Sequence, residues 1–423
     1  MAGAQEGGSA HALPAVHRLF PGAFYGWFIV AGGSLLSFVV VGVGFYGMAV
    51  FLDGLCNERG WSRTSVSFAT SLYFVTTGLA GSLIGRSVDR HGARGWIAAG
   101  ALVMGLALVL IGQVDAPWQL YLVYPLLGCG FAMTGGVPSN AIITRWFTAR
   151  RARAMSIAQT GVSVGGVVLV PFATHLILSQ GFTTATRVLA GLVVAVVLPV
   201  VLFVLRWDPA PYGLAPDGGA PAPAPAPGAE LRGRHWTARE ALATRAFWIL
   251  VAAFGGILFC QVAVAMHQIA LLRERIDPTA AAYAVSTTAF GSIVARLVVG
   301  GFADRVSKRR LGSALMLVQA VALVAFALAA DAPLLYAASL LFGFTIGNLF
   351  MLQALLVAEL FGVASFGSVL GLLQLVTQTA SGLGPFALGL LYAGFGGYEV
   401  GLGLLAGLAV LSAAFLWRVP APS

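Results

Sequence analysis

Apolar stretches of about 20 residues or more recur along the whole 423-residue chain. Each is long enough to cross about 30 Å of hydrocarbon as a helix. Hydrophobic residues make up 59% of the sequence and charged residues 9%, against about a quarter charged in soluble proteins. We therefore predict an all-α membrane protein with twelve transmembrane helices. The expected spans are residues 24–51, 62–85, 95–113, 118–146, 152–179, 186–206, 246–271, 280–302, 311–330, 333–358, 364–392 and 398–417.

One long polar segment, residues 207–245, divides the spans into two sets of six. It contains an Ala-Pro alternation over 220–227 that favours an extended polyproline II linker. A passive linker is the main interpretation, and regulation through Arg232, Arg234 and His235 is the alternative. The predicted organisation is an N-terminal tail (1–23), a first six-helix bundle (24–206), the linker (207–245), a second six-helix bundle (246–417) and a C-terminal tail (418–423).

The net charge of +9 is better explained by membrane topology than by a nucleic-acid partner. Of the 24 lysines and arginines, 18 fall on the side of the N-terminus, 5 on the opposite side, and Arg296 within a span. Because positive charge is enriched in cytoplasmic loops, both termini are expected in the cytoplasm. Residues 1–23 are polar and the first apolar run is long enough to span, so we expect no cleavable signal peptide. We predict a multi-pass protein of the cell inner membrane.

Three scattered cysteines, Cys56, Cys129 and Cys260, have no paired spacing that would indicate a disulfide framework or a metal site. We expect no cofactor, no metal and no nucleic-acid partner, and by default a monomer surrounded by lipid. An enzyme would need clustered acids, bases or metal ligands, and the spans offer none.

Two related motifs lie at equivalent places in the two halves. Gly85, Asp89, Arg90, Gly92 and Arg94 lie between spans 2 and 3. Their counterparts between spans 8 and 9 are Gly300, Asp304, Arg305 and Lys308, about half the chain length further on. This repeat is expected for a transporter built from two related six-helix units, so the two bundles should be related by pseudo-twofold symmetry.

The first motif resembles the loop signature of the major facilitator superfamily, and the second is a degenerate copy of it. The narrower pattern is similar to the bacterial monocarboxylate transporter and oxalate/formate antiporter branch. It rests on residues 25–27, on 150–154 with Gly161, Gly165 and Pro171, and on Arg296. It also includes Glu359, Phe361 and Gly362, and Gly382, Gly384 and Pro385.

Arg296 lies about 12 Å along span 8 from Asp304, which places it near the middle of the membrane. Its helical neighbours Thr288, Ser292 and Gly300 form a small, polar stripe expected to face other helices or a cavity. A guanidinium matches a carboxylate through two parallel hydrogen bonds, and no carboxylate is nearby in the spans. We predict that a small organic anion supplies the missing charge. The family resemblance implies the same role; the alternative is a structural arginine.

Departures from the family pattern narrow the expected substrate. Animal monocarboxylate transporters typically carry an aspartate one turn before this arginine, where this chain has Ser292. The oxalate antiporters add a lysine in span 11, whereas no Lys or Arg occurs here between Arg310 and Arg418. A single fixed cation favours a monoanion, because a dianion would leave one buried charge unpaired.

Polar residues in other spans are further candidates for the substrate site. His267 in span 7 is predicted to bind substrate or to carry a coupling proton, with a structural interhelical role as the alternative. Asn348, Gln374 and Gln378 are predicted substrate contacts, although such groups also bridge helices. His175 is expected to be structural.

The motifs are predicted to act as a gate between the halves. Glycine in the motif, at Gly85 and Gly92, should permit a tight turn at the helix end, and Asp89 should accept hydrogen bonds from a neighbouring helix N-terminus. The adjacent Arg90, with Asp304 and Arg305 in the second copy, should tie the halves together on the cytoplasmic side. The predicted function is secondary transport of a lactate- or pyruvate-like monocarboxylate with a proton. The alternatives are carboxylate exchange of the oxalate/formate type and transport of an uncharged solute.

Overall fold

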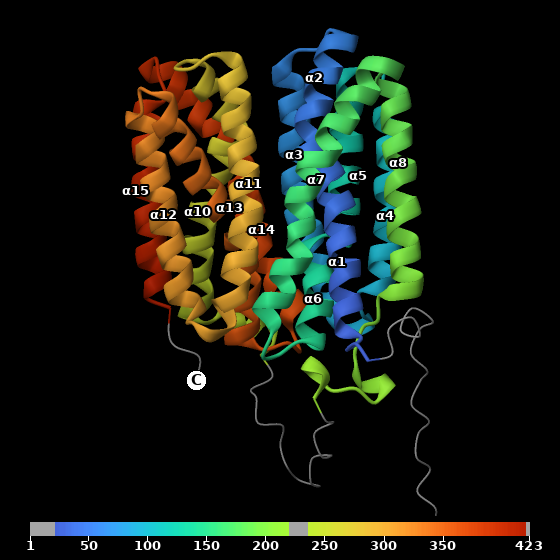
Figure 1. Ribbon diagram of the computed structural model, residues 1–423. Helices are drawn as coiled ribbons and strands as arrows, with labels where there is room; N and C mark the ends of the chain where they lie inside the picture. The colour runs from blue at the N-terminus through green and yellow to red at the C-terminus, as the bar shows by residue number, and fades with distance from the viewer. Residues whose placement is uncertain (1–21, 220–235, 420–423) are drawn as a thin grey trace, which may run out of the picture.

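The computed structural model describes residues 22–219 and 236–419, and within these ranges the chain is helical with no strand. The predicted N-terminal tail, the Ala-Pro alternation, Arg232, Arg234, His235 and the last four residues lie outside the described part. Helices α1 to α8 form one group and α10 to α15 a second beside it (Figure 1). This is the two-bundle, all-α architecture predicted from the sequence.

Two spans of the first group contain a break in regular helix. α1 (Gly26–Val41) passes through a π-helical turn, η2 (Gly42–Tyr46), into α2 (Gly47–Arg59). α5 (Pro117–Thr134) meets α6 (Gly136–Trp146) at Gly135. The other helices of this group are α3 (Arg63–His91), α4 (Arg94–Ile111), α7 (Arg151–Gln180) and α8 (Phe182–Pro199), which ends in the π-helical turn η3 (Val200–Val204).

The second group follows two short helical turns, η4 (Ala210–Tyr212) and η5 (Pro216–Gly218), and the short helix α9 (Ala238–Leu242). Its spans are α10 (Arg245–Arg273), α11 (Pro278–Phe302), α12 (Lys308–Leu328), α13 (Ala332–Phe361), α14 (Phe366–Phe395) and α15 (Glu399–Trp417). A 3-10 turn, η6 (Ala303–Arg305), joins α11 to α12.

Eleven of the described helical segments are long and apolar enough to cross a membrane. The segment not among them is α14, although it has 30 residues. Its Gln374, Gln378, Thr377 and Ser381 lower its mean hydropathy. It nevertheless packs against α3 of the first group and α10 of the second, where the two groups meet (Figure 1). Its polar residues are therefore sheltered by other helices, as expected for a span that lines the protein interior.

The two groups meet through glycine-mediated contacts of α3 with α14 and of α7 with α11. A Cβ added at Gly85 would collide with the carbonyl of Gly367, and one added at Gly300 would collide with Ser156. Gly85 lies inside α3, where its missing side chain allows close helix packing. The turn is made by Gly92, whose φ is 81°.

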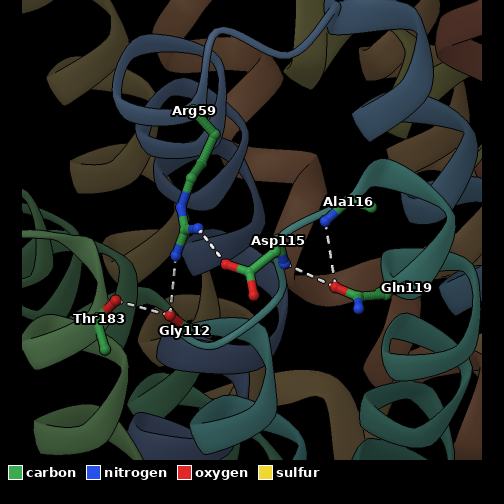
Figure 2. Close-up of polar contacts among 6 residues, drawn as sticks. All are labelled: Arg59, Gly112, Asp115, Ala116, Gln119 and Thr183. Carbon is green, nitrogen blue, oxygen red and sulfur yellow. Dashed lines mark hydrogen bonds and ion pairs between the residues drawn. The ribbon is translucent and has the colours of Figure 1, made fainter.

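Away from the motifs, each group is tied at its opposite end by one arginine. In the first group Arg59, at the end of α2, pairs with Asp115 at 3.0 Å and donates to the Gly112 carbonyl, which also accepts from Thr183 (Figure 2). The side-chain carbonyl of Gln119 accepts hydrogen bonds from the backbone N–H groups of Asp115 and Ala116. This cluster joins α2, the α4–α5 loop and α8.

The second group repeats the arrangement with Arg275, just after α10. Arg275 pairs with Glu399 of α15 at 2.6 Å. It also donates to the carbonyls of Phe326 and Ala329 at the end of α12. The two arginines are separated by nearly the same interval as the motif residues Asp89 and Asp304. Each half therefore has corresponding helices fixed together, so each half is braced as a unit.

Candidate functional site

Arg296 lies in α11 at the contact with α7 of the other half, and only 2% of its surface is exposed. Its Nη1 donates to the hydroxyl of Ser163 in α7. The Ser163 hydroxyl is also 2.9 Å from the hydroxyl of Ser292, one turn before Arg296. The Ser156 hydroxyl donates to the Arg296 backbone carbonyl. Two serines of α7 thus hold this segment of α11 against the first half.

The Arg296 guanidinium lies against the backbone of Gly347 in α13, where an added Cβ would collide with it. Its Nε has no hydrogen-bond partner. Within the described ranges no Asp or Glu forms an ion pair with Arg296, so the prediction of a missing counter-charge stands in this structure. Leaving a buried cation without its counter-ion costs about 3–5 kcal/mol, which makes Arg296 a strong attractor for an anion.

Tyr46 is a neighbour of Arg296 that the sequence interpretation missed. Its ring packs beside Gly166 of α7, three residues after Ser163, whose hydroxyl accepts from the Arg296 guanidinium. Tyr46 is the last residue of the π-helical turn η2. Such turns occur frequently at functional sites, but the apolar run around Tyr46 gave no signal of one.

His267 lies apart from Arg296, within the second half. Its Nδ1 is 3.0 Å from the Tyr398 hydroxyl, and its Nε2 is 3.1 Å from the Pro385 carbonyl. A carbonyl can only accept, so Nε2 carries the proton and Nδ1 accepts from Tyr398. In this conformation both ring nitrogens are engaged in the interhelical contacts of the alternative interpretation. The substrate or proton role of His267 stays a prediction. His175 is exposed.

The amide candidates lie on two helices. Asn348 is fully buried next to Gly347; its Nδ2 donates to the Phe344 carbonyl at 3.0 Å, whereas its Oδ1 has no partner. Gln374 faces α6 of the first half, because a Cβ on Gly136 would lie 3.2 Å from its Nε2. Gln378 is half-buried one turn further along α14. Asn348 is thus a sequence neighbour of the residue that Arg296 touches, and Gln374 reaches across the two halves.

The two motif aspartates make matching contacts across the halves. Asp89 at the end of α3 accepts from the backbone N–H groups of Gly367 and Ser368 at 2.8 and 2.7 Å, and from the Ser368 hydroxyl at 2.7 Å. These groups form the N-terminus of α14. A carboxylate at a helix N-terminus satisfies free N–H groups and complements the helix dipole. This is the type of contact predicted for Asp89.

Asp304 repeats the contact in the other direction. It accepts from the backbone N–H groups of Ala152 and Arg153, at the start of α7, at 2.7 and 3.1 Å. We call the end of the molecule that carries Asp89 and Asp304 the motif face. The expected tie through Arg90 and Arg305 is not seen in this conformation: both are exposed, and in the described part of the chain neither forms an ion pair across the halves. The carboxylates carry the contact.

Residues 34–274 and 262–423 match the family model described as Major Facilitator Superfamily. Monocarboxylate transporter 13 of Bos taurus is 28% identical over 412 residues, covering 92% of this chain and 89% of the relative. The oxalate:formate antiporter of Oxalobacter formigenes is 25% identical over 235 residues, covering 55% of this chain and 52% of the relative.

Solved structures share the fold at lower sequence identity. The human organic anion transporter MFSD10 superposes with a TM-score of 0.69 at 15% identity, covering 92% of this chain and 98% of the other. The transporter FucP in its outward conformation gives 0.68 at 13% identity, covering 93% and 99%. At these identities the likeness concerns the helix arrangement alone.

Proposed function

Because the chain belongs to the major facilitator superfamily, we propose that this multi-pass membrane transporter carries a small monocarboxylate by alternating access, with Arg296 binding the carboxylate. The family makes the chain a transporter and not an enzyme. The observation that carries the proposal is the buried Arg296 guanidinium, which has a free Nε and no acidic partner in the described ranges. A carboxylate arriving from solution would remove this imbalance.

The position of Arg296 supports alternating access. It contacts α7 of the first half and α13 of the second, so a bound anion would interact with both halves. Each half is braced at its opposite end by Arg59 or Arg275, which favours rocking of the halves as units. The hydrogen bonds of Asp89 and Asp304 across the halves would then break and form again with this motion.

The charge distribution supports an orientation in the membrane. The motif face carries most of the lysines and arginines, so we propose that it faces the cytoplasm, with both termini on that side. We propose a bacterial inner membrane as the location. In this orientation the described conformation is closed towards the cytoplasm by Asp89 and Asp304.

A thermal-shift screen of the purified protein tests the substrate class. Lactate and pyruvate should raise the unfolding midpoint of the wild-type protein, because a ligand that binds only the folded state stabilises it. Oxalate should raise it less, since Arg296 offers a single charge. The Arg296→Gln variant should respond to none of them. A shift given only by uncharged sugars would contradict the carboxylate assignment, and equal shifts of both proteins would contradict the role of Arg296.

Exchange of one carboxylate for another is the second candidate, and the likeness to the oxalate:formate antiporter favours it. Proteoliposomes without internal anion separate the two mechanisms. Proton symport predicts that acidifying the outside drives lactate uptake, because anion and proton together reorient without moving net charge across the membrane. Uptake that instead requires internal lactate or formate, and ignores the pH gradient, would establish exchange.

A further inference from the structure

The first part of the expected linker is packed against the first half. We call residues 205–219 the linker arm. Asp208 of the arm pairs with Arg145 at 3.3 Å, and the Arg145 guanidinium lies 4.2 Å from the centre of a Trp207 ring. Trp207 also covers Gly92, the turn glycine of the first motif, where a Cβ would lie 3.3 Å from the indole. The arm is therefore a fixed part of the motif face.

Asp217, near the end of the arm, binds three consecutive backbone N–H groups. Its Oδ2 accepts from Thr148 and Ala149 at 2.9 and 2.7 Å, and its Oδ1 accepts from Arg150 at 3.1 Å. Asp217 is the one non-glycine residue in the described ranges with a positive φ, 61°. Non-glycine residues rarely adopt this conformation and keep it only where their surroundings impose it. The three hydrogen bonds supply that constraint.

The loop bound by Asp217 leads directly into α7, the helix that Asp304 binds from the other half. Asp217 accepts hydrogen bonds from the backbone N–H groups of residues 148–150, and Asp304 accepts them from those of Ala152 and Arg153. One helix start is thus shared by two carboxylates. The Asp217 contact lies within one half, whereas the Asp304 contact must break whenever the halves separate at the motif face.

The carboxylates of Asp217 and Asp304 repel each other, but the attraction of each carboxylate to the N–H groups at the start of α7 is stronger. Arg151 interacts electrostatically with Asp217, Asp304 and Glu359, and so offsets their charges. Repulsion between partly exposed charges is further reduced by salt, which screens them over about 8 Å. Hydrogen bonds to a carboxylate are roughly twice as strong as neutral ones, and Asp217 accepts three. Removing Asp217 should therefore loosen the start of α7 and not strengthen its contact with Asp304.

We propose that the linker arm contributes to closure of the motif face. Asp217 holds residues 148–150 in the conformation that lets Asp304 bind the start of α7. Because Asp217 remains bound when the halves separate, the docking site for Asp304 stays formed through the transport cycle. Loss of Asp217 would make closure of the motif face less favourable. The proposal does not depend on the identity of the substrate.

Distance measurements between spin labels at the motif face test this inference. We would place the labels at the exposed Arg86 of α3 and Arg310 of α12, in the full chain with Cys56, Cys129 and Cys260 replaced. Asp217→Ala should increase the ratio of long to short distances by about tenfold. Asp217→Asn, which keeps one acceptor oxygen, should give a smaller increase of about threefold.

The matched control is Asp331→Ala. Asp331 also precedes a helix, α13, but its side chain gives that helix no capping hydrogen bond, so its loss should leave the distances unchanged. Folding is checked by the thermal unfolding midpoint, and should Asp217→Ala fold poorly, Asp217→Asn decides alone. A folded Asp217 variant with the wild-type distance distribution would overturn the proposal, because the arm would then be only packing.

Discussion

Replacing Arg296 with glutamine is expected to lower monocarboxylate uptake by about 100-fold or more while leaving the amount of folded protein close to that of the wild type. Glutamine cannot neutralise a carboxylate, and losing one partner of a buried ion pair costs about 3–5 kcal/mol. At 1.4 kcal/mol for each factor of ten, this exceeds 100-fold. Folding should suffer little, since the substitution removes a buried charge that has no acidic partner in the described ranges.

Uptake of labelled lactate into proteoliposomes, normalised to folded protein, measures this effect. Arg187→Gln is the matched control, because the same substitution is made at an exposed arginine of α8. It should leave uptake unchanged. Ser163→Ala should reduce uptake by less than Arg296→Gln, since Ser163 only positions the guanidinium. Wild-type uptake by folded Arg296→Gln would remove Arg296 from the substrate site and leave the family assignment intact.

The helices were predictable because a span that crosses hydrocarbon must be a long apolar run. The repeat was predictable because the motif with Asp89 and its copy with Asp304 mark the same point in each half. α14 shows the limit of hydropathy alone: its amides and hydroxyls lower its apolar signal, yet neighbouring helices shelter them. The length of its apolar run, residues 364–392, still predicted it as a span.

The site was predictable only where the feature lay within one helix. Arg296 stood out as a lone charge, and its stripe was expected to face other helices. Thr288 accepts a hydrogen bond from Gln268 of α10, and the Ser292 hydroxyl is hydrogen-bonded to that of Ser163 in α7. The sequence carries no information on which helix of the other half lies opposite, so Ser163 and Tyr46 were missed. Asp217 was missed for another reason: its Pro- and Gly-rich surroundings are typical of a free loop.

The second large effect is expected for Asp89→Asn, which should slow lactate uptake by about tenfold or more without a comparable loss of folded protein. Asp89 accepts three hydrogen bonds from α14. Asparagine keeps one acceptor oxygen and turns an NH2 donor towards an N–H donor. Hydrogen bonds to charged groups contribute about 1.5–3 kcal/mol each, so closure of the motif face should lose about 3 kcal/mol, or roughly 100-fold in its equilibrium.

Asp304, the counterpart of Asp89 in the second motif, allows the effect of Asp89→Asn on uptake to be compared within the same protein. Asp304 accepts two hydrogen bonds from α7, one of them longer, so Asp304→Asn should slow uptake less than Asp89→Asn. Both contacts favour closure of the same face and share no hydrogen-bond partner, so their free-energy losses should add, and the double variant should be slowed by about the product of the two single effects. Asp331→Asn serves as the control on the opposite face. Wild-type uptake per folded molecule in Asp89→Asn would mean that the contact with α14 stabilises the fold without governing closure.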